Sequence, residues 1–259
     1  FYSSQYEVAT YVEDLMQALN GEQVKESVNS LWQAFQELST KPAISTNQNL
    51  VLQKAELLVT RSQSIYSDLK SYQSNINEQI KDDVDRANEI GNRVYELNLK
   101  IQKVEAGGVE TAMTLRDERD TLLDELGQYG RIDVTEDATG FCYVDFEGVR
   151  FIDDHKCYNM GLNPAKGTGF YTPYWPQQSD LANEKYVPVF RLEDEISTEM
   201  NTDVGGIKSK LLARGNRYGV AADLETEKAY SKVSNSTVME VEAQIDTLFS
   251  RIVKAMNDV

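Results

Sequence analysis

The sequence predicts a mainly α-helical protein with a β-rich insertion, built as an elongated bundle of long helices from both ends of the chain. Two apolar patterns of helical spacing carry this prediction: one runs for about forty residues in the first half of the chain, and the other runs to its end. Between them, residues 131–203 change to strand-like alternation and hold four of the five prolines. We therefore expect a helical domain of residues 1–130 plus 204–259, with a small β and loop domain of residues 131–203 at its tip.

The longest helix is predicted from about Asn47 to Glu105, which gives roughly 85–90 Å at 1.5 Å per residue. No proline interrupts it, its one glycine (Gly91) costs about 1 kcal/mol, and Gly107-Gly108 are expected to end it. Its apolar residues step by three or four positions and so share one side of the helix. This stripe consists of Ile65, Leu69, Tyr72, Ile76, Ile80, Val84, Ala87, Ile90, Val94, Leu97, Ile101 and Val104.

Three shorter helices flank the longest one. Two precede it, from Ser4 to Asn20 and from Glu22 to Leu38, and Gly21 and Pro42 are expected to end them. A third runs from about Thr111 to Leu126, and its alternating charges predict ion pairs within the helix, each worth roughly a few tenths of a kcal/mol. The apolar faces are Tyr11, Leu15 and Leu19 in the first helix, Val24, Val28, Leu31, Phe35 and Leu38 in the second, and Leu115, Leu122, Leu123 and Leu126 in the third.

The middle of the chain reads as strands and loops. Arg131 to Asp153 alternate apolar and polar side chains around turn signals at Asp137–Gly140 and Glu147-Gly148, which predicts a β-hairpin or meander. Asn159 to Val189 is predicted as an irregular, aromatic-rich segment with one or two short strands, for example Tyr186–Phe190.

Helical character returns near the end of the chain. Gly205-Gly206 are expected to precede a short helix from Ile207 to Asn216, and one long helix is expected from Asp223 to Val259. Its heptad seam is Val238, Val241, Ile245, Leu248, Ile252, Ala255 and Val259. The seam needs an apolar partner, and the stripe of the longest helix is the longest available. The residues expected to meet are Ile90, Val94, Leu97 and Ile101 on the stripe and Ile245, Leu248 and Ile252 on the seam.

Composition excludes several classes of partner. Asp and Glu number 42 and Lys and Arg 26, so the net charge of −16 repels nucleic acid phosphates and anionic lipids, and neither partner is expected. No apolar run reaches the roughly 18 residues of a membrane span, and no secretory signal peptide opens the chain. Cys142 and Cys157 are expected as free thiols, and a disulfide is the alternative if their strands are neighbours.

We predict no catalytic, cofactor-binding or metal-binding residue, and hence no enzyme and no cofactor. The common nucleotide-binding, hydrolase and redox motifs are absent. For His155 beside Asp153 and Asp154, a polar turn is favoured over a metal or acid–base cluster, which needs more ligands. At Gly205-Gly206 a tight joint is favoured over an anion site, and at Trp175 a loop mini-core is favoured over a ligand platform.

Several motifs occur in the order of a known family. The Arg119–Leu126 helix segment and the following strand resemble the "R-D-x-L-L-D-E-L" helix and "V-x-V-T-E" strand of the flagellar hook-associated protein 1 family, that of the first hook–filament junction protein. The other matching segments are Leu31–Ser39 before Pro42 ("Q-E-L-S"), Asn75–Ile80, Tyr95–Asn98 with Ile101, and Gly205–Gly215 ("G-G-x-x-x-x-L-L").

The resemblance implies a structural adapter that joins hook and filament of the bacterial flagellum by helical packing in a tubular assembly. Expected partners are further copies of the chain, the hook protein, the second hook–filament junction protein and, for the full-length protein, an export chaperone. The expected location is extracellular, after export by the flagellar type III route. Full family members also carry an Asn-rich first segment and a further heptad-bearing tail, so the chain is expected to be a core fragment lacking both termini.

Two alternatives stay open. Flagellin and the second junction protein belong to the same axial class and share the plan of helices at both ends. An extracellular adhesin or tether belongs to another class, and its β-rich tip would bind a ligand through Tyr171, Tyr174 and Trp175.

Overall fold

The structure is a computed structural model that describes residues 1–18, 21–107 and 111–257. The chain forms two compact units. Unit 1 comprises Phe1–Gln5 and Ser74–Arg217, and unit 2 comprises Tyr6–Gln73 and Tyr218–Val259. Of the residues named in the sequence analysis, Leu19, Asn20, Gly108, Val259 and the side chain of Val24 lie outside the described part.

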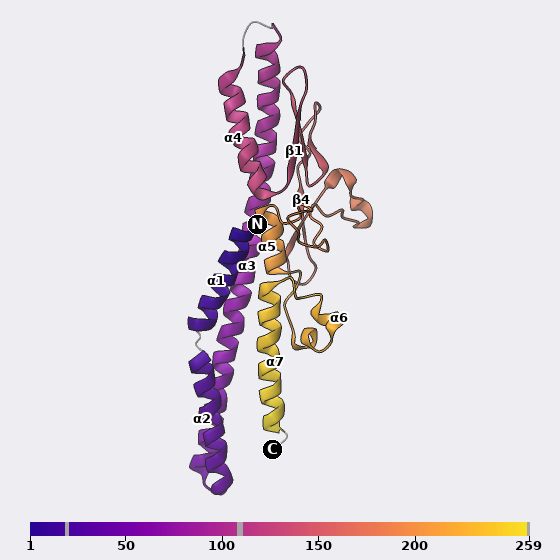
Figure 1. The fold of residues 1–259 in the computed structure, drawn as a ribbon. Helices are drawn as coiled ribbons and strands as arrows, with labels where there is room; N and C mark the ends of the chain where they lie inside the picture. Colours follow the sequence, from indigo (N-terminus) through magenta and orange to yellow (C-terminus); the bar gives the residue numbers. More distant parts are fainter. Residues whose placement is uncertain (19–20, 108–110, 258–259) are drawn as a thin grey trace. The chain divides into compact units, whose positions relative to one another are not determined.

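Unit 2 is a helical bundle (Figure 1). Its long helices are α1 (Tyr2–Ala18) from Tyr6 onward, α2 (Gly21–Thr40), the first part of α3 (Ser45–Glu105) and α7 (Thr237–Asn257). Two short elements, η3 (Ala221–Leu224) and α6 (Glu227–Tyr230), precede α7. The bounds of α1, α2 and α3 confirm the helices predicted from apolar spacing, and Pro42 follows the end of α2 as expected.

Two apolar clusters hold unit 2 together. The first joins α2, α3 and α7, and its members include Leu31, Ala34, Val51, Leu58, Phe249, Ile252 and Met256. The second joins α1, α3 and α7 through Leu15, Ile65, Leu69, Val241, Ile245 and Phe249. The stripe of α3 is therefore the partner of the closing helix, as predicted.

The predicted register of that pairing is wrong. Ile245 packs against Ile65 and Leu69, whereas Ile90 and Leu97 belong to unit 1. The predicted seam of α7 is confirmed in part, since Val241, Ile245 and Ile252 lie in the two clusters. Leu248 is 47 % exposed and Ala255 is exposed, and Phe249 and Met256 face the core in their place. An aromatic ring and a Met side chain fill more of the space between two helices than the Leu248 and Ala255 positions of the heptad would.

The closing helix is also shorter than predicted. Instead of one helix from Asp223, the chain forms η3 and α6 and then begins α7 at Thr237. Ser236 stands just before α7, and its hydroxyl accepts a hydrogen bond from the Met239 N–H at 3.3 Å. Ser is a preferred N-cap residue because it satisfies a backbone donor that has no partner within the helix.

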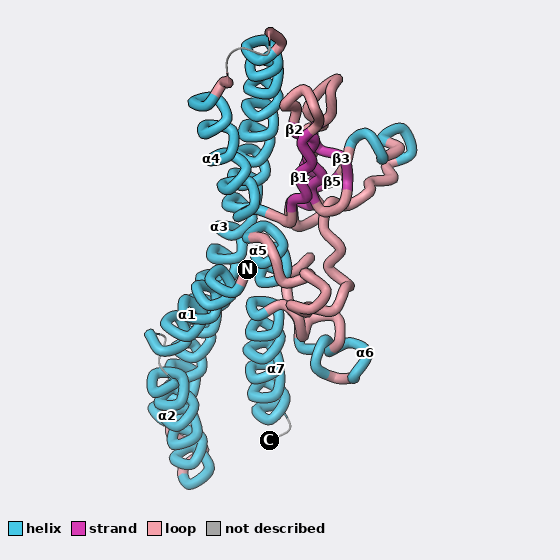
Figure 2. Tube along the Cα trace, turned by 45° about the horizontal axis from the view of Figure 1, so that its top comes forward, coloured by secondary structure: helices cyan, strands magenta, loops and turns pink. Residues whose placement is uncertain are grey.

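Unit 1 packs strands on the second part of α3 (Figures 1 and 2). Its helices are α4 (Met113–Tyr129) and α5 (Gly206–Arg214). The strands β1 (Ile132–Glu136), β2 (Cys142–Phe146) and β3 (Val149–Ile152) form an antiparallel meander in the order β1-β2-β3. The predicted meander and both of its turns are therefore confirmed.

Two further strands and two short 3₁₀ helices complete the loop-rich part of unit 1. The strands β4 (Gly161–Pro164) and β5 (Tyr171–Tyr174) pair antiparallel, and η1 (Pro176–Gln178) and η2 (Leu181–Asn183) follow. The predicted strand at residues 186–190 is wrong, because that segment holds only an isolated bridge from Pro188 to Tyr174. The alternation of apolar and polar residues did not predict β4 and β5, because each contains a proline (Pro164 and Pro173). Proline lacks the N–H that a strand donates to its neighbour, so it is read as a loop residue.

The predicted stripe is the buried face of α3. Ten of its twelve members are at most 5 % exposed, while Tyr72 is half-buried and Val104 is 40 % exposed. Tyr72 stacks on Tyr11 of α1 with ring centroids 3.7 Å apart. The boundary of the domain predicted at residues 131–203 stays a prediction. No helix in the described part is long and apolar enough to cross a membrane.

Leu97 tests the burial of the stripe. The side chain is completely buried, so Leu97→Asp places an unpaired charge in the interior and should reduce the free energy of unfolding by about 3–5 kcal/mol. Leu99→Asp is the matched control, because Leu99 lies on the same helix and is 45 % exposed. Denaturant unfolding measures both variants, and an unchanged midpoint for Leu97→Asp would contradict the buried stripe.

Gly91 tests how closely the sheet approaches α3. A Cβ there would lie 2.6 Å from the Phe151 ring and 2.7 Å from Cys157 Sγ, so Gly91→Ala should destabilise the protein by about 1–3 kcal/mol despite alanine's higher helix propensity. At Gly127 in α4 the nearest atom is 3.8 Å away, so Gly127→Ala should stabilise by about 0.5–1 kcal/mol. Thermal unfolding of the two variants should shift in opposite directions, and equal shifts would show that the close approach is absent.

Candidate functional site

The His155 segment is a polar turn. Asp153 Oδ1 accepts hydrogen bonds from the N–H groups of His155 and Lys156, both at 2.9 Å, and Asp153 Oδ2 accepts one from the Tyr158 hydroxyl at 2.7 Å. His155 itself is exposed, 3.5 Å from Asp154. These contacts confirm the turn interpretation. Across the described residues, no group of three or more His, Cys, Asp or Glu side chains is placed to hold a metal ion.

Trp175 belongs to an aromatic core. Its ring is completely buried and lies 6.5 Å from the Phe146 ring and 6.0 Å from the Phe151 ring. The mini-core interpretation is confirmed, and the buried Trp175 ring is closed to a ligand, which the alternative of a ligand platform does not allow. Tyr171 and Tyr174 are only half-buried in the β4–β5 hairpin.

The two cysteines are free thiols, as expected. Cys142 is buried in β2, and Cys157 packs beside Gly91. Burial raises the pKa of each thiol to about 12, because the thiolate loses its hydration. Neither thiol is therefore activated as a nucleophile.

Gly205 forms a tight joint. Its φ of +88° favours glycine, and a Cβ there would lie 2.6 Å from Gly130 Cα and 2.7 Å from the Tyr129 carbonyl oxygen. The end of α4 and the start of α5 therefore meet backbone to backbone, which confirms the joint predicted at Gly205-Gly206.

A buried polar cluster connects α3, α4 and the three-stranded sheet. At its centre Arg119 is 2 % exposed, and its guanidinium donates to Asn98 Oδ1 at 3.1 Å, the Gly140 carbonyl at 2.7 Å and Glu136 Oε2 at 2.7 Å. A buried guanidinium is tolerated only where acceptors of this kind compensate for its lost hydration. The cluster therefore fixes the position of α4 and β1 on α3.

Arg116 extends the cluster to the end of α3. It donates to both carboxylate oxygens of Glu105, at 2.8 and 2.6 Å, and to Glu136 Oε1 at 2.7 Å. The hydrogen bonds that Glu105 receives from Arg116 and from the Ala112 N–H lower its pKa to about 2. For Glu136, burial acts to raise the pKa, but hydrogen bonds from Arg116 and Cys142 and the charges of both arginines lower it overall. Both carboxylates therefore stabilise the fold above their ordinary pKa, and this contribution is lost as the pH falls below about 4.5.

Only one of the ion pairs expected within the Thr111–Leu126 helix is found among the described contacts, between Arg119 and Asp120 at 3.7 Å. The shorter ion pairs of α4 reach another helix: Arg93 on α3 pairs with Glu118 at 2.6 Å, and Arg86 on α3 pairs with Glu125 at 2.7 Å. Alternating charges are compatible with pairs along a helix or across helices. Only the position of the neighbouring α3 decides between them.

Three asparagines on α3 bind the backbone of the β-rich region; we call them the asparagine series (Asn77, Asn88 and Asn98). Each side-chain amide both donates to a carbonyl and accepts from an N–H, as a neighbouring strand would. Asn98 contacts Cys142 at 2.8 and 3.2 Å, and Asn88 contacts Met160 at 3.0 and 2.8 Å. Asn77 donates to the Gly169 carbonyl at 3.5 Å and accepts from the Tyr171 N–H at 2.7 Å.

Arg214 connects α5 to the same series. It is 2 % exposed and donates to Asn77 Oδ1 at 2.6 Å and to the Tyr171 carbonyl at 3.0 Å. Its guanidinium also lies 4.8 Å from the centre of the Phe170 ring. Burial lowers the pKa of Arg214 to about 10, so the group stays charged at neutral pH.

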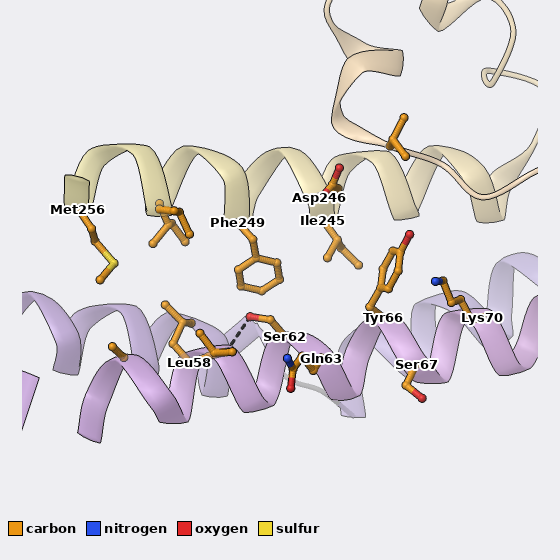
Figure 3. Close-up of a pocket in the computed structure, with 15 residues that line it drawn as sticks. Leu58, Ser62, Gln63, Tyr66, Ser67, Lys70, Ile245, Asp246, Phe249 and Met256 are labelled. Carbon is orange, nitrogen blue, oxygen red and sulfur yellow. Dashed lines mark hydrogen bonds between the residues drawn. The ribbon is translucent and has the colours of Figure 1, made fainter. Parts of the chain in front are cut away.

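Unit 2 contains an open apolar groove between α3 and α7. Its volume is about 710 Å³, and Figure 3 shows Phe249 and Met256 pointing from α7 toward α3 and Tyr66 pointing from α3 toward α7. Val59 and Val253 line it while more than half exposed. The polar residues along it include Gln63, Lys70 and Asp246.

Sequence reasoning found the stripe but missed the polar residues beside it. Asn77, Asn88 and Asn98 each follow a stripe residue directly, and their spacing of 11 and 10 keeps them near one face of α3. That spacing was the available signal. Arg119 was missed for a different reason, because a charged residue in a strongly acidic chain is interpreted as solvated surface.

Long helices joined by packed apolar faces and buried polar contacts place this chain in the mainly α-helical class of proteins. Within that class, a family model described as the flagellar hook-associated protein FlgK helical domain matches residues 9–259. The chain belongs to this family.

A solved structure shares the fold. It is the flagellar hook junction protein FlgK from Burkholderia pseudomallei, which is 17 % identical to this chain with a TM-score of 0.63. The match covers 82 % of this chain and 36 % of that one, so this chain spans about a third of that protein's length. A comparison with curated proteins found no match.

The asparagine series gives a stability prediction. Asn98→Ala leaves the buried N–H and carbonyl of Cys142 without their side-chain partners and removes one acceptor from Arg119, so the free energy of unfolding should fall by about 2–4 kcal/mol. Asn75→Ala on the exposed face of α3 should change it by less than about 0.5 kcal/mol. Denaturant unfolding compares the two, and a similar small effect at both sites would show that the Asn98 contacts contribute nothing.

Proposed function

We propose that this chain is the helical core of a structural adapter at the hook–filament junction of the bacterial flagellum. The observation that carries the proposal is the family match over residues 9–259. The contacts of the buried polar residues agree with the proposal, because Arg119, Arg214 and the asparagine series all join elements of the fold to one another. We further propose that the protein works by packing and is not an enzyme.

The proposed partners follow from family membership. They are further copies of the chain in a tubular assembly, the hook protein and the second hook–filament junction protein. The full-length protein would in addition bind an export chaperone. Export by the flagellar type III route to the cell exterior agrees with the chain's few cysteines. Residues 131–203 are proposed to form an accessory domain.

Gene deletion in the native host tests the role. An in-frame deletion should leave hooks without attached filaments and abolish swimming, because the filament would have no adapter to bind. Full-length protein supplied from a plasmid should restore both. Immunogold electron microscopy of an epitope-tagged, complementing copy should place the label at the hook–filament boundary.

Two results would reject the proposal. The first is a deletion strain that swims with attached filaments. The second is label spread over the cell surface, which is the pattern expected of an adhesin or tether.

A further inference from the structure

A carboxyl group is buried in the helix–helix seam of unit 2. Glu242 of α7 is 0 % exposed and lies one turn before Ile245, in the line that continues to Phe249 and Ile252. Its Oε2 atom accepts a hydrogen bond from the Gly219 N–H at 2.6 Å, while Oε1 is buried with no hydrogen-bond partner. A buried carboxylate with a single neutral donor is poorly compensated for its lost hydration.

The surrounding groups supply little compensation. From α3, Lys70 and Tyr66 face the carboxyl group, and Lys70 Nζ lies over the rings of Tyr66 and Tyr218 at 4.4 and 4.6 Å. Tyr218 belongs to the segment before η3, and Asp246 lies one turn further along α7. Asp246 is a second acid, and its Oδ2 accepts from the Ala221 N–H at 2.7 Å.

The segment before η3 is closely fitted to α7. A Cβ at Gly219 would overlap the carbonyl oxygen of Met239, so only glycine brings this N–H to Glu242. The hydrogen bonds to Glu242 and Asp246 therefore hold residues 219–221 on α7. Opening this contact would bring water to Glu242.

We propose that Glu242 is a protonation switch in unit 2. With the carboxyl group neutral, α7 and residues 219–221 stay packed on α3; with the group ionised, this packing loosens. The neutral acid still accepts the Gly219 hydrogen bond and leaves no buried charge. The ionised acid is better solvated when the seam opens.

The direction of the pH effect follows from burial. Loss of hydration raises the pKa of Glu242 from 4.5 to about 7, against smaller lowering effects of the Gly219 hydrogen bond and the charge of Lys70. Because the closed state binds the proton more tightly than the open state, closure is favoured at low pH and weakens as the pH rises toward 7. The closing equilibrium should change about tenfold per pH unit, or roughly 300-fold in all, and then level off.

This inference goes beyond the proposed function, because it concerns the closing of unit 2 and not what the protein joins. Hydrogen exchange read by mass spectrometry tests it on the whole chain. Protection factors for peptides of α7 are measured from pH 5 to 8.5 and corrected for the intrinsic pH dependence of exchange. In the wild type they should fall by about tenfold per unit up to pH 7 and then stay level.

Two variants isolate the carboxyl group. Glu242→Gln keeps the acceptor without the charge and should remove the slope. Glu240→Gln changes a partly exposed acid on the same helix, which bonds to the Tyr230 hydroxyl, and should keep the wild-type slope. A wild-type profile that is flat or rises with pH overturns the proposal, and so does a Glu242→Gln profile with the wild-type slope. Should Glu242→Gln fail to fold, the wild type and Glu240→Gln still test the proposal. Protection factors of α7 that do not change with pH in these two proteins would overturn the switch.

Discussion

The burial of one face of α3 is the constraint on which the other contacts depend. A single helix of 61 residues carries the stripe, and no isolated helix of mixed composition is stable enough to leave such a face in water. Its first part is covered by helices in unit 2, and its second part is covered by α4 and the strands in unit 1. The same apolar spacing thus serves two kinds of partner. The residues beside the stripe therefore have to differ between the two parts.

The partners that α3 packs against differ between the two units. In unit 2, α3 meets other helices, whose backbone groups are already paired within each helix, so side chains such as Leu58 and Phe249 suffice. In unit 1, α3 meets strand ends and loops, which bring unpaired N–H and carbonyl groups to the interface. The asparagine series pairs these backbone groups, since one side-chain amide hydrogen-bonds to both an N–H and a carbonyl of the facing segment. Arg119 pairs with acceptors only, because it donates to two of them, the Gly140 carbonyl and Glu136.

This difference explains what the sequence could predict. The long helix, the meander with its turns and the joint at Gly205 follow from local spacing and turn chemistry, and all are found. The register of α7 does not, because Ile65 and Ile90 are equivalent in an apolar pattern. The predicted seam went wrong only at Leu248 and Ala255, because a strict heptad chose them over the neighbouring Phe249 and Met256, which face the core. Buried charges and amides can be placed only once their partners from distant segments are known.

The two units also use carboxyl groups with opposite consequences for pH. Glu136 receives hydrogen bonds from two guanidinium groups, so its ionised form is the stable one and its pKa lies below the ordinary value. Glu242 is completely buried and receives one neutral N–H, so its burial stabilises the protonated form. The Glu136 side chain is 38 % exposed and Glu242 is completely buried, so both the burial and the number and charge of the donors favour opposite directions of the pKa shift. Mild acidification from pH 7 toward 4.5 therefore favours closure around Glu242, while the contacts of Glu105 and Glu136 weaken only below that range.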